Sequence, residues 1–201
     1  METTPLLLRQ QVRHAQMTIP PGAVSLRKAR DLCDLCNSGS AFDDPKFSRM
    51  RMVLRLHSRM GAGDWWALLG YAWSMCDDVA THRAKLTRIW SASSPEVRHR
   101  AMTTRNRRAL DRLPDVLTVY RGCYGYLNEK GFSWSLSDDI ARTFPFLIRY
   151  RIDDAVPLLL TGTVRKSDVL LHLDRSEREV IAPSSRVKIA GREVLPNRPQ
   201  S

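Results

Sequence analysis

Two glutamates, Glu177 and Glu179, stand two positions apart at the start of an apolar run, in the stretch DRSEREVIAP that begins at Asp174. On a β-strand, residues i and i+2 project from the same face, so the two carboxylates would lie side by side. Adjacent carboxylates repel each other, which costs stability unless a cation or a substrate offsets the repulsion. Arg175 and Arg178 could balance the pair as a solvated edge, or the pair could be the acidic part of an active site.

An arginine followed by glycine ends an earlier strand-like run, TVYRG, from Thr118 to Gly122. The planar guanidinium of Arg121 could hold a phosphate through paired hydrogen bonds, and Gly122 would let a ligand approach the bare backbone. An arginine at the end of a strand is usually a solvated charge, so this run alone indicates little.

Serines alternate in a third piece, GFSWSLSDDIARTF, which begins at Gly131. Ser133 and Ser135 would project from one face of a strand, while Trp134 would project from the other face into the core. Hydroxyls on one face can orient a neighbouring carboxylate and a ribose. Alternating serines are also common on half-exposed strands, so the three pieces gain weight only together.

The first half of the chain is expected to be helical. Apolar residues and arginines at helical spacing predict an amphipathic helix from Lys46 to Met60. A more apolar helix is expected after an N-cap at Asp64, and an arginine-rich helix after an N-cap at Ser94, running to about Leu113. Before them, only a short helix over residues 25–35 is expected.

The second half is expected to form a sheet, because short runs rich in β-branched and aromatic residues alternate with turn residues after Pro114. We expect an antiparallel or mixed sheet with one interposed helix, Asp138 to Phe144, capped by Ser137. The strand-like runs are VLTVYRG, GFSWSLS, PLLLTGTV, DVLLHL, EVIA, RVKIA and REVL.

These patterns predict an α+β protein with a helical N-terminal part followed by a compact part of short strands. The expected divisions are a loosely structured segment 1–44, a helical lobe 45–112, a β-rich domain 113–195 and a flexible tail 196–201. The sequence shows no run typical of a membrane span or a signal peptide, so a soluble cytoplasmic protein is expected.

The charge is strongly positive and uneven. The formal net charge is +11, and most of the excess lies in the first 110 residues. This balance favours an anionic partner such as nucleic acid, although a basic surface also serves solubility. Cys33 and Cys36 form a lone C-x-x-C without a second pair at zinc-site spacing, so we expect reduced thiols and no metal.

Taken in order, the three motifs closely resemble the R-S-E signature of mono-ADP-ribosyltransferases. Y-R-G closes a strand, S-x-S leads into LSxxxAxxF, and E-x-E leads into VIxP; the similarity runs from Leu113 to Ile189. The resemblance implies a split β-sandwich of short strands that binds NAD, cleaves the bond between nicotinamide and ribose, and transfers ADP-ribose to an acceptor. Trp134 stands where the family has threonine.

The resemblance also implies roles for single residues. Glu179 would stabilise the positive charge that builds on the ribose during cleavage, and Ser133 would orient it. Arg121 would bind the NAD phosphates, and the backbone of Gly122 would meet the nicotinamide carboxamide. Glu177 would orient and deprotonate the incoming nucleophile.

Further residues complete the expected NAD-binding set. These are Tyr120, Ser135 and Phe144, and the aromatic residue that stacks on nicotinamide remains open between Phe144, Phe146 and Tyr150. No metal is implied.

The acceptor is suggested by the first glutamate, because in this family E-x-E accompanies the modification of arginine. A protein arginine is therefore the leading acceptor, and enzymes of this kind often act as toxins or as effectors between phage and bacterium, with an inhibitor or antitoxin protein as a partner. The basic helix from Arg98 to Arg108 motivates a nucleic acid as the alternative acceptor. A plain NAD glycohydrolase and a non-catalytic basic module that binds nucleic acid are the remaining alternatives.

Overall fold

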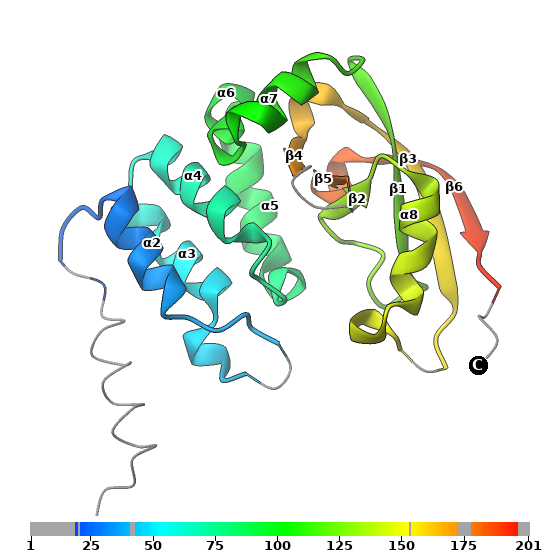
Figure 1. The fold of residues 1–201 in the computed structure, drawn as a ribbon, viewed down its shortest axis with the longest axis horizontal. Helices are drawn as coiled ribbons and strands as arrows, with labels where there is room; N and C mark the ends of the chain where they lie inside the picture. Colours follow the sequence, from blue (N-terminus) through cyan, green and yellow to red (C-terminus); the bar gives the residue numbers. More distant parts are fainter. Residues whose placement is uncertain (1–18, 20, 41–42, 153, 173–177, 197–201) are drawn as a thin grey trace, which may run out of the picture. The chain divides into compact units, whose positions relative to one another are not determined.

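The computed structural model describes residues 19, 21–40, 43–152, 154–172 and 178–196, and its mixed helices and antiparallel sheet confirm the α+β class. The chain folds into two compact units (Figure 1). The first is built from the chain up to His82 and from Glu96–Ala101, and the second from Arg83–Pro95 and from Met102 onward. Two segments that we assigned to the helical lobe therefore belong to the unit that contains the sheet.

The first unit consists of short helices with serine caps. The short helix expected near residue 25 is confirmed, because Ser25 accepts a hydrogen bond from the Lys28 backbone N–H at 3.4 Å. The predicted helix from Lys46 to Met60 is interrupted, since Ser48 is extended and caps a new helix there. The elements are α2 (Leu26–Asp34), η1 (Pro45–Phe47), α3 (Arg49–Leu56), η2 (His57–Arg59), α4 (Ala62–Trp73), η3 (Val79–His82) and η4 (His99–Ala101).

The predicted N-cap of the apolar helix at Asp64 is wrong. Gly61 is the N-cap of α4, with an extended backbone (φ −61°, ψ 145°) and no side-chain hydrogen bond. Asp64 lies within the first turn, where its carboxylate still interacts favourably with the positive end of the helix dipole. A preference for capping residues therefore located this helix but misplaced its start by three residues.

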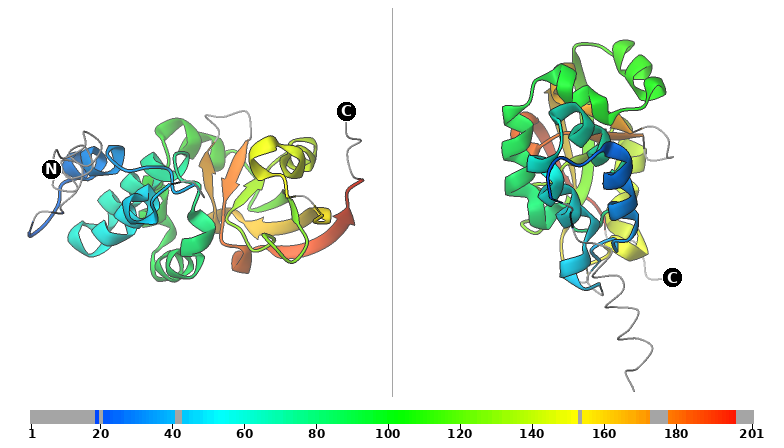
Figure 2. Two further views of the ribbon diagram at one scale, coloured as in Figure 1. Left: turned by 90° about the horizontal axis from the view of Figure 1, so that it is seen from below. Right: turned by 90° about the vertical axis from the view of Figure 1, so that its left-hand side faces the viewer.

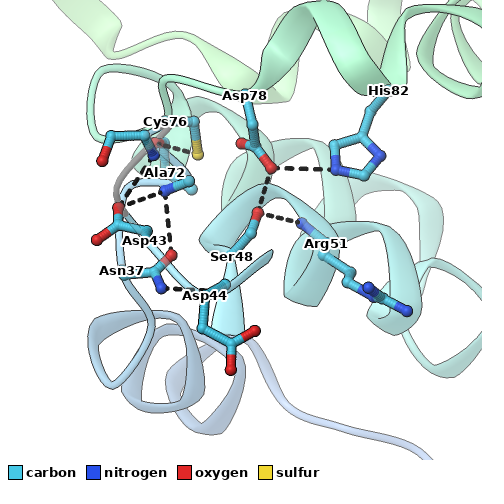
Figure 3. Close-up of polar contacts among 11 residues, drawn as sticks. Asn37, Asp43, Asp44, Ser48, Arg51, Ala72, Cys76, Asp78 and His82 are labelled. Carbon is cyan, nitrogen blue, oxygen red and sulfur yellow. Dashed lines mark hydrogen bonds and ion pairs between the residues drawn. The ribbon is translucent and has the colours of Figure 1, made fainter. Parts of the chain in front are cut away.

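Polar contacts join the segments of the first unit (Figure 3). The Ser48 hydroxyl donates to Asp78 Oδ2, and Nε2 of His82 lies 3.1 Å from the same oxygen. Nearby, the guanidinium of Arg49 donates to the backbone carbonyls of Cys33, Cys36 and Met75. These bonds tie the end of α2 and the segments that follow α2 and α4 to the start of α3.

The four cysteines are free thiols. Burial raises the pKa of Cys33, and it raises the pKa of Cys36 to about 11 and that of Cys76 to about 12. Thiols with such pKa values are poor nucleophiles at neutral pH, because the reactive species is the thiolate.

The predicted arginine-rich helix from Ser94 to Leu113 is wrong as a single element. The chain forms α6 (Pro95–Arg98), passes through η4 and starts again as α7 (Thr104–Asp111), where Thr103 caps the new helix by accepting from the Asn106 backbone N–H. A further helix that we did not predict, α5 (Arg83–Ala92), precedes them. No helix in the described part of the chain has the length and apolarity needed to cross a membrane.

The second unit contains one six-stranded antiparallel sheet in the order β4-β5-β2-β1-β3-β6. Figure 2 shows β6 as the outer strand beside β3. Our two predicted strands RVKIA and REVL are one strand, β6, with a register shift opposite Thr161 and Gly162. The strands are β1 (Val116–Tyr124), β2 (Ser133–Ser135), β3 (Pro157–Arg165), β4 (Leu170–His172), β5 (Glu179–Ile181) and β6 (Lys188–Val194).

Helix α8 (Asp138–Thr143) packs closely against the sheet. The predicted cap is confirmed, because Ser137 accepts a hydrogen bond from the Ile140 backbone N–H. A side chain at Gly122 would place its Cβ 1.9 Å from the carbonyl oxygen of Ala141, so only glycine allows the helix this near to β1. Trp134 is 3% exposed, which confirms its expected place in the core.

We expect opposite effects from two glycine substitutions in α4. Gly70→Ala would place Cβ 1.9 Å from the carbonyl oxygen of Ala101, whereas Gly63→Ala would meet only the Arg100 side chain at 3.6 Å. Gly70→Ala should therefore lower the free energy of unfolding by about 1–3 kcal/mol, and Gly63→Ala should raise it by up to about 1 kcal/mol through helix propensity. Urea-induced unfolding of the full chain measures both, and equal effects of the two substitutions would contradict this packing.

Candidate active site

The three sequence motifs lie on three adjacent strands. The sheet order places β5, which carries Glu179, next to β2, which carries the serines, and β2 next to β1, which carries Arg121. The register aligns Glu179 with Ser135 and Ser135 with Tyr120. Residues directly opposite each other share a face, with Cβ atoms about 4.5–5.5 Å apart. Segments nearly sixty residues apart in the chain are thus neighbours in space.

Glu179 occupies a sheltered position. It is 9% exposed, and it begins β5 between β2 on one side and β4 on the other. A carboxylate this little exposed requires hydrogen bonds or a nearby cation, because burying an isolated charge is costly. The described structure provides polar neighbours on both sides of it in the sheet.

Ser133 is expected to orient Glu179, and the register shows how both serines lie relative to this glutamate. Ser135 lies directly opposite Glu179, whereas Ser133 lies opposite Ile181. The reason is that β5 begins at Glu179 and runs antiparallel to β2, so the end of β2 meets the start of β5. Sequence spacing places the two serines on one face but cannot show which of them meets the glutamate.

The two serines make different contacts. The hydroxyl of Ser135 accepts a hydrogen bond from the Ser137 backbone N–H at 3.1 Å, which holds the turn that leads into α8. The backbone carbonyl of Ser133 accepts from Nη1 of Arg121 at 2.6 Å. The S-x-S motif therefore links the glutamate strand to the arginine strand.

Arg121 is held by the backbone of the segment that follows it. Its Nη1 donates to Ser133 O, and its Nη2 donates to Asn128 O at 2.8 Å. Asn128 is itself fixed, because its Oδ1 accepts from the Tyr124 backbone N–H at 2.7 Å. Gly131 leaves room for the guanidinium, since a Cβ there would lie 2.2 Å from Nη2.

Because side chains alternate along β1, the side chain of Arg121 leaves the strand on a different face from that of Glu179. Tyr120 shares a face with Ser135 and Glu179, so the next residue, Arg121, leaves the strand toward the opposite face, next to Trp134. Its guanidinium is nevertheless an electrostatic neighbour of Glu179. Burial lowers the pKa of Arg121, and the nearby groups of Cys123, Glu179 and Tyr150 partly oppose that effect.

One N–H group of Arg121 lacks a hydrogen-bond acceptor within the described part of the chain. Its Nε is buried and has no hydrogen-bond partner within the described part of the chain. An unsatisfied buried donor costs about 1–3 kcal/mol, so such a group is either a local strain or a place where a bound molecule supplies the acceptor. A phosphate oxygen is an acceptor of the kind that a guanidinium binds best.

The space over Gly122 is occupied by protein. The Ala141 carbonyl and the ring of Pro145 fill the position that a side chain would take. The glycine is thus required by the packing of α8, and a ligand could meet Gly122 only through its backbone.

The candidate aromatic residues have different surroundings in the structure. Phe146 and Tyr120 pack against the buried cluster of Ala141, Leu159 and Leu195. Phe144 instead stacks on Tyr150, with ring centroids 5.8 Å apart and an angle of 25° between the planes. The Phe144–Tyr150 pair is therefore the better candidate for stacking on a planar ring.

His172 joins the candidate site through the pairing of β4 with β5. It is the last residue of β4 and lies directly opposite Glu179, on the side away from Ser135. Its Nδ1 is buried without a hydrogen-bond partner in the described structure. The sequence suggests only that His172 belongs to the segment before the glutamates that would contact the acceptor, and the register shows that it lies directly beside Glu179.

Glu177 lies outside the described residues, so its expected position beside Glu179 stays a prediction. Among the residues that the structure describes, no group of three His, Cys, Asp or Glu side chains is arranged to hold a metal ion. No protein-family model, curated protein or solved structure matches this chain.

We expect Arg121→Lys to destabilise the second unit. An ammonium group cannot donate to Ser133 O and Asn128 O from the two fixed positions that the guanidinium provides, so one buried carbonyl would lose its partner. The free energy of unfolding should fall by about 1–3 kcal/mol. The matched control is Arg142→Lys at an exposed ion pair with Glu193, which should change stability little. Equal stability of Arg121→Lys and wild type in urea unfolding would show that the two bonds are unimportant.

Proposed function

We propose that this protein is a mono-ADP-ribosyltransferase that cleaves NAD between nicotinamide and ribose and transfers ADP-ribose to a macromolecular acceptor. The observation that carries the proposal is the adjacency of β5, β2 and β1. It places Glu179 and Ser135 on one face of neighbouring strands, while the guanidinium of Arg121, which leaves β1 on the other face, still lies within electrostatic range of Glu179. Three motifs in the order of a known signature gain support when the fold brings their strands together.

The chemistry of the gathered groups supports cleavage of a glycosidic bond to a cationic leaving group. As the bond from ribose C1′ to the nicotinamide nitrogen breaks, its electron pair goes to nicotinamide and positive charge builds on the sugar. A carboxylate that is sheltered from water stabilises this charge more than one in bulk solvent would. Glu179 is such a carboxylate, and in the proposed role it lies against the ribose.

Arg121 would hold the diphosphate of NAD. Its guanidinium is fixed by two carbonyls, interacts electrostatically with Glu179, and has a buried Nε without a partner among the described residues. A rigid cation orients a dinucleotide at little entropic cost, because it is already in place before binding. We propose that the nicotinamide ring stacks on the Phe144–Tyr150 pair, because Tyr150 is also an electrostatic neighbour of Arg121.

The sheet itself supports the finer fold proposal. β1 pairs with β3 through nine aligned residues but with β2 through the single pair Tyr120 and Ser135. This narrow connection divides the sheet into β4-β5-β2 and β1-β3-β6. Two three-stranded halves that separate at one point are what a split β-sandwich of short strands requires.

For the acceptor, the E-x-E pattern of Glu177 and Glu179 favours a protein arginine. A guanidinium is cationic at neutral pH, so a second carboxylate can both attract and aim it. His172 lies on the β4 side of Glu179, away from Arg121's strand. If the dinucleotide covers β1 and β2, the acceptor would reach the ribose from this β4 side.

The test is nicotinamide release from NAD by wild type and by Glu179→Gln. Loss of the carboxylate should lower the rate by about 10²- to 10³-fold or more, because the charge on the sugar loses its main stabilising group. Glu193→Gln is the matched control, since Glu193 is an exposed glutamate on β6. The proposal fails if wild type releases no nicotinamide or if Glu179→Gln retains the wild-type rate.

The acceptor is tested in parallel with biotin-labelled NAD in a cell lysate. Glu177→Gln should keep nicotinamide release and lose the protein label, because Glu177 is expected to act only on the nucleophile. Label that disappears after nuclease treatment and survives protease treatment would show a nucleic-acid acceptor instead. Nicotinamide release without any macromolecular label would show a glycohydrolase.

A further inference from the structure

We infer that α7 is a docking surface for nucleic acid beside the proposed active site. The helix and its C-cap carry four arginines and one acidic residue, Asp111. The arginines are Arg105, Arg107, Arg108 and Arg112, of which all but the half-buried Arg107 are exposed. This is a dense positive charge on a helix of eight residues.

Helix α7 is fixed in place by its buried side. Leu110 is 2% exposed and Asn106 is 1% exposed, and α7 packs against β4 in the second unit (Figure 1). Next to it, the Sδ atom of Met102 accepts a hydrogen bond from the Leu171 backbone N–H at 3.1 Å. Because one side of α7 is anchored by these contacts, its arginines are presented on a rigid element.

Three of the four arginines of α7 and its C-cap lack an ion pair within the described structure. Arg107, Arg108 and Arg112 form no ion pair with any residue that the structure describes, in contrast to Arg142 and Arg192, which pair with glutamates. Among the residues that the structure describes, Arg107 donates only to the Thr104 hydroxyl, at 3.4 Å. Cations that the protein leaves uncompensated are available to an anionic partner.

The position of α7 relates it to the acceptor side of the site. It packs on β4, and β4 pairs with β5 so that His172 lies opposite Glu179. One strand spacing and one layer of packing separate α7 from Glu179's strand. A nucleic acid bound along α7 would span this separation within a few nucleotides. The use of the surface in catalysis rests on the proposed function with a nucleic acid, in place of a protein arginine, as the acceptor. The docking itself does not rest on the proposed function.

The composition of α7 favours nucleic acid over an acidic protein. Its only large apolar side chain, Leu110, is buried, so the exposed side offers no apolar anchor of the kind that dominates protein–protein binding energy. Arginine forks match phosphate geometry, and protein–nucleic acid interfaces are polar and strongly positive. The chemistry therefore fits a sugar–phosphate backbone better than a folded protein face.

The experiment measures binding of a short fluorescent single-stranded RNA to three forms of the full chain. The first is wild type, and the second is the double variant Arg108→Gln/Arg112→Gln. The third is Arg165→Gln/Lys188→Gln, which removes the same charge from exposed positions of β3 and β6 in the same unit. The equal net charge of the two variants separates a located surface from a general effect of a basic protein.

We expect the α7 variant to bind RNA at least about tenfold more weakly than wild type, with a salt dependence reduced by roughly one to two phosphate contacts. The control variant should bind nearly as wild type does. An equal loss in both variants, no loss in the α7 variant, or binding of poly-L-glutamate as tight as that of RNA would each overturn the inference.

Nicotinamide release is measured on the same preparations. The α7 variant should release nicotinamide at the wild-type rate, because α7 lies outside the proposed NAD site. If wild type binds RNA through α7 but releases no nicotinamide, the proposed function fails and the docking surface stands. If nicotinamide release depends on Glu179 while RNA binding ignores α7, only this inference fails.

Discussion

The burial of the Arg121 guanidinium between its own strand and the segment that follows is the constraint on which the rest of the site depends. A buried cation needs hydrogen bonds at fixed positions, and Ser133 O and Asn128 O supply two of them. These bonds tie the start of β2 and the loop before it to β1, where the sheet itself provides only one aligned pair. The hydrogen bonds of Arg121 thus replace part of the backbone pairing that β1 and β2 lack. The position of β5, which carries Glu179, is then set as well, because β5 pairs with β2.

The same arrangement explains why glycine occurs at two nearby positions. Gly131 leaves room for the guanidinium, and Gly122 leaves room for the carbonyl of Ala141, so α8 can lie directly on β1. The serines then connect the layers, since Ser135 holds the turn before α8 and Ser137 caps it. The motif residues therefore have a structural role first: they hold together the two halves of a sheet that share few backbone hydrogen bonds. Their proposed chemical roles use side chains whose positions are already fixed by these structural contacts.

The sequence predicted the strands and the cap of α8 well, because these depend on local alternation and on one serine. It also predicted that Trp134 would be buried, since its neighbours are polar on the opposite face. It could not predict that Ser135 meets Glu179, or that His172 lies beside it, because strand register is set by contacts between distant segments. The break of the arginine-rich helix at Thr103 was missed for a related reason: helical spacing continues through a point where a new cap restarts the helix.

The most direct measurement is a crystal structure of the full chain with a non-hydrolysable NAD analogue. The account predicts that the nicotinamide ribose lies against the Glu179 carboxylate and that a diphosphate oxygen is within hydrogen-bond distance of the Arg121 guanidinium. Binding of the analogue elsewhere, with the ribose away from Glu179 and the diphosphate away from Arg121, would contradict it.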